Sequence, residues 1–221
     1  SIVFGLELSN SSKVVLKVFN PQIEKHYLQE INSIQGTFNA EKFPAPLVLT
    51  EIFDFYDAYA GFYEYIDGNI QDAHIPVVRH ELAKYLAEFV NIVEKYKFKP
   101  LLNFFQQQSD VNQLWPKPHN TLFNLEATSQ GADWIEDKAK AARRILLKQN
   151  QPLILAHTDW RVENVYFVGN KLTAVFDWDS LGSMSELELL GTAAAQFTTN
   201  FRLNIKLTPT PDEARAFISE Y

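Results

Sequence analysis

The chain has 221 residues, of which 46% are hydrophobic and 14% aromatic, so it can bury a sizeable core as one large domain or two unequal lobes. Its formal net charge of −7 disfavours nonspecific binding to a nucleic-acid backbone or an anionic membrane. The absence of cysteine excludes disulfides and a thiol nucleophile. Because it also has no long apolar run and no signal-like start, we expect a cytoplasmic protein that does not enter membranes.

Strands are predicted in the first third of the chain as short stretches rich in β-branched and aromatic residues, bounded by polar turn formers or proline. These stretches are Ile2–Leu8, Lys13–Phe19, Leu47–Phe55 and Tyr59–Ile66. Between the second and third stretches, apolar residues recur at helical spacing from Ile23 to Gln35. The pattern therefore predicts a small sheet with one helix.

The rest of the chain is predicted to be helical at its core. Helical spacing of apolar residues and alanine-rich composition predict helices at Val77–Tyr96, Trp134–Gln149 and from Ala214 onward. The stretch Phe98–Ala132 is rich in Pro, Asn and Gln and is predicted to be an irregular insertion. Short apolar runs predict strands at Pro152–Ala156, Val165–Val168 and Leu172–Phe176.

Polar side chains gather between these last strands. Asp159 follows an apolar strand, Asn164 comes five residues later, and Asp177 is expected at the end of a short hairpin. Three oxygen donors would then converge on one point. Such donors suit a hard cation such as Mg²⁺, which commonly takes one or two carboxylates from the protein. A remaining carboxylate could accept the proton of a hydroxyl group during phosphoryl transfer.

The pattern His157-x-Asp159-x-x-x-x-Asn164, followed by Phe176-Asp177-Trp178, resembles the catalytic loop and metal-binding aspartate of a protein-kinase-like fold. The resemblance is to its aminoglycoside phosphotransferase and choline kinase branch. It implies that Asp159 is the catalytic base and that Asn164 and Asp177 ligate Mg²⁺. It also implies that His157 packs the loop.

The resemblance extends upstream and covers the chain from about Phe4 to Gly191. Lys17 lies in an apolar strand that resembles the family strand whose lysine contacts nucleotide phosphates. Because an unpaired buried ammonium group is costly, a carboxylate partner is expected. The resemblance implies that this partner is a glutamate on the next helix, where Glu30 is the first candidate and Glu24 is the second.

The resemblance also implies the nucleotide-base site and the overall fold. The linker residues Glu64, Tyr65 and Ile66 would present their backbone to the base of ATP or GTP. The implied fold is α+β and two-lobed, with a nucleotide-binding lobe at residues 1–66, made of a small antiparallel sheet and one helix. A larger, mainly helical lobe at residues 67–221 would carry the catalytic loop and the substrate site. The oligomeric state is left open.

The Gly-rich phosphate loop of such folds is not visible. Gly5 is the only glycine before Gly36, and the chain starts inside an apolar stretch. We therefore expect the first strand of the small lobe and its Gly-rich loop to lie outside this numbering.

For two residues around the motif, Arg161 and Asp179, the sequence allows alternative roles. Where the family often has glycine and a second histidine, this chain has Thr158 and Arg161. Arg161 either contacts an anionic substrate or phosphate, or pairs with Glu163 or Asp179. Asp179 either supports the metal indirectly or caps the next turn.

The acceptor pocket is expected in the least motif-like parts of the chain, within Phe98–Ala132 and Met184–Arg202. Aromatic side chains in and after the first of these stretches either wall that pocket or form the core of an insertion. They are Trp115, His119, Phe123 and Trp134.

The favoured function is transfer of the γ-phosphoryl group of ATP or GTP to a hydroxyl group of a small molecule. One alternative is a catalytically silent pseudokinase that binds a nucleotide or metabolite, which the missing Gly-rich loop motivates. The other is a two-metal phosphoesterase that uses His157-x-Asp159 with Asp177-x-Asp179.

Overall fold

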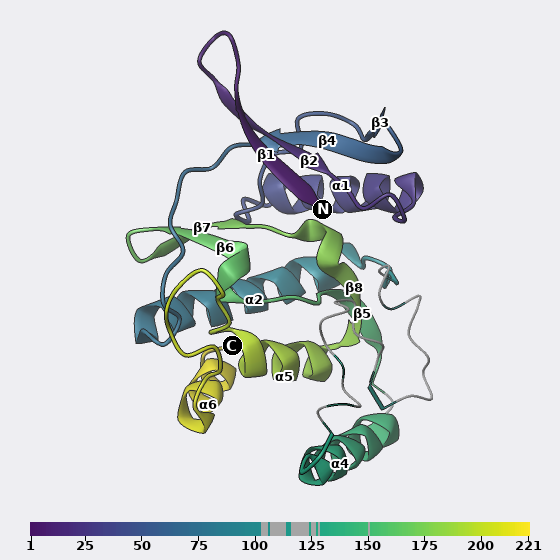
Figure 1. Cartoon of the computed structure of the whole chain (residues 1–221), viewed down its shortest axis with the longest axis vertical. Coiled ribbons are helices and arrows are strands. Elements are labelled where there is room, and N and C mark those ends of the chain that lie inside the picture. Colours follow the sequence, from purple (N-terminus) through teal and green to yellow (C-terminus); the bar gives the residue numbers. More distant parts are fainter. Residues whose placement is uncertain (103–105, 107–113, 116–123, 125–126, 128, 150) are drawn as a thin grey trace.

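A computed structural model describes residues 1–102, 106, 114–115, 124, 127, 129–149 and 151–221. A small sheet with one helix beneath it forms the upper part of the molecule in Figure 1, and helices with short strands form the larger lower part. The predicted mixed α+β architecture is confirmed. The predicted domain division after residue 66 stays a prediction.

The small sheet is antiparallel, with strand order β1-β2-β4-β3. Its strands are β1 (Ile2–Glu7), β2 (Lys13–Val18), β3 (Phe53–Phe55) and β4 (Ala58–Glu64). The β1–β2 hairpin extends away from the larger part of the molecule, with its turn at the far end (Figure 1). Lys17 is paired with Gly61 across the sheet.

The predicted strand Leu47–Phe55 is wrong over most of its length, because only its last 3 residues form β3. Upstream, a single isolated bridge joins Val48 to Tyr63. The hydroxyl group of Thr50 accepts a hydrogen bond from the backbone N–H of Phe62 at 3.0 Å. Since this side chain takes the place of a backbone acceptor, the ladder is interrupted there.

Helix α1 (Lys25–Ala40) connects the sheet to the rest of the molecule. Leu28 packs with Phe19, Ile52 and Tyr63 against the sheet. Residues further along α1, including Phe38, belong instead to the large core. One amphipathic helix therefore fixes the position of the strand carrying Lys17 relative to the larger part of the molecule.

The larger part consists of four described helices and two strand pairs. The helices are α2 (Pro76–Tyr96), α4 (Asp133–Gln149), α5 (Glu186–Gln196) and α6 (Pro211–Glu220). The strands are β5 (Leu153–His157), β6 (Val165–Val168), β7 (Lys171–Val175) and β8 (Leu181–Ser185), with β5 paired to β8 and β6 to β7. Most of the predicted insertion Phe98–Ala132 lies outside the described residues.

The linker after β4 is held against the β6–β7 hairpin. Asn69 and Phe167 exchange two backbone hydrogen bonds, each 2.9 Å long. A Cβ atom on Gly68 would lie 2.8 Å from Cβ of Tyr166, so only glycine allows the linker to pass this closely. These contacts hold the linker directly against the β6–β7 hairpin, which follows Asn164.

Strand β8 and helix α5 were not predicted. Helix α5 begins with a capping box in which Ser185 and Glu188 each accept a hydrogen bond from the other's backbone N–H. This Ser-x-x-Glu spacing before an apolar run is a sequence signal that could have located the helix.

We expect Ser185→Ala to lower the free energy of unfolding by about 1 kcal/mol, because the substitution leaves a helix N–H group without its side-chain acceptor. Ser219→Ala is the matched control, since Ser219 is an exposed helical residue whose hydroxyl group donates to the Arg215 carbonyl oxygen. Urea denaturation of both variants measures the difference. Equal destabilisation of the two variants would contradict the capping role.

Within the described ranges, no helix is both long and apolar enough to cross a membrane.

Candidate active site

The polar segment begins where β5 ends at His157. Trp160 is 1% exposed, and its indole N–H donates to the carbonyl oxygen of Leu82 on α2 at 3.2 Å. Burial of Trp160 holds the loop after β5 against the core and leaves the preceding Asp159 side chain 29% exposed. The sequence Asp-Trp therefore places one carboxylate at the surface of a rigid turn.

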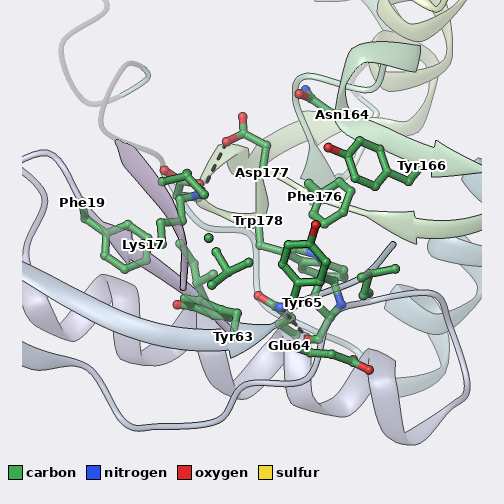
Figure 2. A pocket seen from close by; sticks show the side chains of 18 of the residues that line it. Lys17, Phe19, Tyr63, Glu64, Tyr65, Asn164, Tyr166, Phe176, Asp177 and Trp178 are labelled. Atoms are coloured by element: carbon green, nitrogen blue, oxygen red, sulfur yellow. Dashed lines mark hydrogen bonds and ion pairs between the residues drawn. The ribbon is translucent and has the colours of Figure 1, made fainter. Parts of the chain in front are cut away.

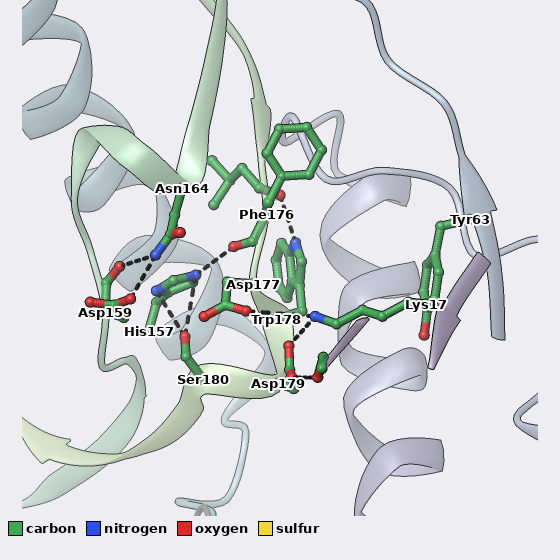
Figure 3. Close-up of polar contacts among 12 residues, drawn as sticks. Lys17, Tyr63, His157, Asp159, Asn164, Phe176, Asp177, Trp178, Asp179 and Ser180 are labelled. Carbon is green, nitrogen blue, oxygen red and sulfur yellow. Dashed lines mark hydrogen bonds and ion pairs between the residues drawn. The ribbon is translucent and has the colours of Figure 1, made fainter. Parts of the chain in front are cut away.

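Asn164 is joined to Asp159 twice (Figure 3). Its Nδ2 atom donates to the backbone oxygen of Asp159 at 2.9 Å and to Oδ2 of its carboxylate at 2.8 Å. Because both donors of the amide are directed toward Asp159, Oδ1 of Asn164 is turned away. Among the described residues, that oxygen has no hydrogen-bond partner.

Asp177 follows β7 in a left-handed backbone conformation, with φ 61° and ψ 42°. Non-glycine residues rarely adopt this region, and such strain is frequent at functional sites. The next residue, Trp178, is 4% exposed and packs edge-on against Phe38 of α1 at 5.1 Å. A second tryptophan thus anchors a second aspartate, in the same way that Trp160 anchors Asp159.

The donor set fits a hard cation. Asp177 supplies a carboxylate, and Asn164 supplies an amide oxygen without a partner, which are the ligand types that Mg²⁺ prefers. Partial burial and the negative charge of Asp179 raise the pKa of Asp177, so a cation beside it would stabilise its ionised form. The described residues contain no group of three or more His, Cys, Asp or Glu side chains that could hold a metal ion.

Lys17 reaches this segment from the sheet. Its ammonium group is hydrogen-bonded to Asp179 and lies 3.6 Å from Oδ1 of Asp177 (Figure 3). Burial alone would lower the pKa of Lys17, but the two carboxylates outweigh this effect and raise it. Burial would raise the pKa of Asp179, yet the charge and hydrogen bond of Lys17 lower it.

The predicted ion pair between Lys17 and Glu30, with Glu24 as second choice, is wrong in this structure. Asp179 belongs to the short helical turn Trp178–Ser180, which packs against α1. That packing brings Asp179 to Lys17 in place of a carboxylate from α1 itself.

A cavity of about 370 Å³ lies between the sheet and the polar segment (Figure 2). The predicted residues that line it are Lys17, Glu64, Tyr65, Ile66, Asn164, Asp177 and Asp179. They come from β2, from the end of β4 and its linker, and from the segments flanking the β6–β7 hairpin. Glu30, His157, Asp159 and Arg161 are not among its lining residues.

The linker end of the cavity offers backbone groups that are available for bonding. Tyr65 and Ile66 follow the last residue of β4. In the part of the chain that the structure describes, their backbone N–H and C=O groups have no hydrogen-bond partner. Such groups can bind the edge of a planar heterocycle.

His157 is 1% exposed and ties the two polar loops together. Its Nε2 atom donates to the Phe176 carbonyl oxygen at 2.8 Å, and its Nδ1 atom lies 3.2 Å from the Ser180 hydroxyl oxygen. Both ring nitrogens are thus engaged with residues adjoining Asp177. This arrangement disfavours the two-metal phosphoesterase, which needs His157 as a metal ligand.

Sequence reasoning missed several residues that line the cavity or border the loop. Gln35 and Tyr63 line the cavity from α1 and β4, and Arg202 lines it from the segment after α5. No motif marks them, because their proximity depends on the packing of distant segments. Of the predicted aromatic wall, Trp115 and Trp134 are exposed, and His119 and Phe123 lie outside the described residues.

Comparison with solved structures identifies several similar folds. An amicoumacin kinase determined with AMP-PNP and Ca²⁺ matches with TM-score 0.67 and 13% identity, covering 99% of this chain and 67% of the other. An ethanolamine kinase of Plasmodium vivax matches with TM-score 0.57 and 18% identity, covering 99% and 64%. A spectinomycin phosphotransferase bound to AMP matches with TM-score 0.55 and 16% identity, covering 96% and 71%.

These likenesses confirm the predicted two-lobed, protein-kinase-like fold. The chain spans about two thirds of the length of these proteins. No curated protein matches the sequence. The model of the phosphotransferase enzyme family matches residues 3–208, which is most of the chain. The protein therefore belongs to the phosphotransferase enzyme family.

Proposed function

We propose that this protein transfers the γ-phosphoryl group of ATP or GTP to a hydroxyl group of a small molecule. The observation that carries the proposal is the arrangement of Asn164, whose amide N–H groups hold Asp159 while its Oδ1 atom has no partner among the described residues. Asn164 thereby holds the carboxylate of Asp159, which is suited to accept a proton. Its own Oδ1 atom is suited to ligate a cation. The family match supports phosphotransfer as the reaction class.

The nucleotide would occupy the cavity between the sheet and the polar segment. Its base would meet the backbone of Tyr65 and Ile66, where N–H and C=O groups have no other described partner. Its phosphates would approach Lys17, which also lines the cavity. A phosphate oxygen can accept a charge-assisted hydrogen bond from the ammonium group of Lys17.

Asn164 and Asp177 would hold Mg²⁺. The ion, when bound, neutralises negative charge on the phosphates. Lys17 adds a second positive charge beside Asp177. The contribution of the chain to catalysis is therefore mainly positioning and charge neutralisation.

Asp159 would act on the acceptor. Oδ2 of its carboxylate is already bonded to Asn164, so the other oxygen is available to accept a hydrogen bond from the acceptor's hydroxyl group. As the acceptor oxygen forms its bond to the γ-phosphorus, the bond from that phosphorus to the bridging oxygen breaks. The hydroxyl proton passes to Asp159, and the nucleoside diphosphate leaves.

Asp179→Asn is expected to weaken Mg²⁺-nucleotide binding about tenfold, which corresponds to about 1.4 kcal/mol. Without the charge of Asp179, Lys17 keeps Asp177 as its carboxylate partner. The ammonium group of Lys17 then competes with the cation for the carboxylate of Asp177. Glu30→Gln should change the affinity less than about twofold, since Glu30 does not pair with Lys17. Titration calorimetry with a nonhydrolysable ATP analogue measures both variants. A larger effect of the Glu30 variant would identify Glu30 as the functional partner.

The proposed function is tested with a panel of hydroxyl-bearing acceptors. Thermal-shift measurements with Mg²⁺ and a nonhydrolysable ATP analogue first select acceptors that stabilise the protein further. Phosphorus NMR then follows ATP with each selected acceptor. We expect a new phosphate monoester and nucleoside diphosphate in equal amounts. Nucleotide binding without any phosphoryl transfer across the panel would favour the pseudokinase alternative.

A further inference from the structure

Arg161 lies at a junction of two ion pairs beside Asp159. Its Nη2 atom is 3.2 Å from Oδ2 of Asp159 and 3.4 Å from Oε2 of Glu163. The side chain of Arg161 is only 24% exposed, and its guanidinium carbon lies 5.7 Å from the centre of the Phe201 ring. Two carboxylates and an aromatic face therefore fix this guanidinium group.

The two carboxylate oxygens of Asp159 differ in their contacts. Oδ2 accepts a hydrogen bond from the side-chain amide of Asn164 at 2.8 Å. The same oxygen lies 3.2 Å from Nη2 of Arg161. Oδ1 has no hydrogen bond or ion pair from any described residue. The carboxylate is thus held by one oxygen, with the other left free.

Glu163 anchors Arg161 to a distant part of the chain. The side chain of Glu163 is 13% exposed, its Oε1 atom accepts a hydrogen bond from the backbone N–H of Phe201 at 3.3 Å, and it lies 3.9 Å from Nε of Arg202. The backbone N–H of Val162 donates to the carbonyl oxygen of Phe197 at 3.0 Å. The segment after α5 therefore supports Arg161 from a direction independent of the catalytic loop.

We propose that Arg161 is a positioning residue that orients the Asp159 carboxylate so that its free oxygen faces the acceptor hydroxyl group. The inference rests on the proposed phosphotransfer. Nη2 of Arg161 lies within ion-pair distance of both carboxylates, and the planar guanidinium group holds that atom in a fixed direction, whereas the ammonium group of lysine is a point charge on a flexible stem. Holding the base in one orientation reduces the rearrangement needed during the reaction.

The kinetic test compares Arg161→Gln with Arg161→Lys. With Mg²⁺, ATP and water as the acceptor, release of inorganic phosphate gives kcat and the KM for ATP. We expect kcat of Arg161→Gln to fall about 10- to 100-fold, because misplacing a reacting group by about 1 Å costs up to about 10²-fold. The KM for ATP should stay within about twofold. Arg161→Lys should recover only part of the lost kcat, since it restores the charge without the planar, rigid guanidinium group.

Arg215→Gln is the matched control, because Arg215 is an exposed arginine that pairs with Asp212 three residues away. It should leave both kinetic parameters unchanged. A kcat for Arg161→Gln within about twofold of the unmodified protein would overturn the proposal. The proposal would also be overturned if Arg161→Gln raised the KM for ATP as much as it lowered kcat and also lowered the melting temperature. Such a result would indicate general structural damage.

A crystal structure of Arg161→Gln gives a readout that does not depend on activity. We expect the Asp159 carboxylate to leave its contact with Asn164 or to occupy two orientations. An unchanged carboxylate, with Oδ2 still bonded to Asn164, would overturn the proposal. If the unmodified protein transfers phosphate neither to water nor to any acceptor of the panel, the proposed function fails, and this structural readout alone decides the role of Arg161.

Discussion

Asp159→Asn is expected to lower kcat for phosphoryl transfer about 10³-fold, within the range of about 10² to 10⁴ that a general base typically contributes. The substitution preserves shape, and the amide oxygen can still accept the hydrogen bond from Asn164. It removes the negative charge that would take up the hydroxyl proton. Binding of the nucleotide should be retained, because Asp159 does not line the cavity.

Steady-state kinetics with an acceptor from the panel, together with calorimetry of nucleotide binding, checks this result. Asp212→Asn is the matched control, since Asp212 is an exposed aspartate that also pairs with an arginine. Phosphoryl transfer at an undiminished rate would remove Asp159 from the role of base. A loss of nucleotide binding equal to the loss of turnover would assign Asp159 to the binding site instead.

Asp177→Asn is expected to reduce turnover about 10²- to 10³-fold and to raise the Mg²⁺ concentration needed for half-maximal activity. The substitution removes the only carboxylate in the proposed cation site. Charge neutralisation of this kind is worth several kcal/mol in the transition state, and each 1.36 kcal/mol is a factor of about ten in rate. The amide of asparagine also leaves Lys17 with Asp179 alone.

Activity measured across a Mg²⁺ titration separates this effect from a fold defect. Asp54→Asn is the matched control, because Asp54 is an exposed aspartate that pairs with Lys25. The account predicts that high Mg²⁺ restores part of the lost activity of Asp177→Asn. A Mg²⁺ dependence identical to that of the unmodified protein would place the cation elsewhere.

The sequence revealed the polar centre because its members are close along the chain. His157, Asp159, Asn164 and Asp177 lie on two neighbouring strand–loop units, so short-range spacing alone suggests that they converge. The tryptophans after Asp159 and Asp177 strengthen the signal, since each anchors its loop in the core. The roles of these residues stay predictions until the variants are measured.

The partner of Lys17 could not be predicted in the same way. The family resemblance points to Glu30 on the next helix, but Asp179 comes from a turn far along the chain. Their contact depends on how α1 packs between the sheet and the larger core. Sequence spacing contains no information about that packing.

The missed and mistaken elements have similar causes. The strand β8 has the sequence LGSMS, which shows no alternation of apolar and polar residues, and it is paired with β5 along its whole length. The predicted strand Leu47–Phe55 has a strand-like composition, yet the Thr50 hydroxyl group interrupts its ladder. In both cases a tertiary contact overrides the local preference.

The proposed function requires that Asp159, Asn164 and Asp177 form one centre beside a nucleotide bound in the adjoining cavity. Its most direct test is a crystal structure with Mg²⁺ and a nonhydrolysable ATP analogue. We expect the base to contact the backbone of Tyr65 and Ile66. The cation should be bound by Oδ1 of Asn164 and by the carboxylate of Asp177, and the γ-phosphate should face Asp159. A nucleotide bound outside the cavity, or a cation that contacts neither Asn164 nor Asp177, would contradict it.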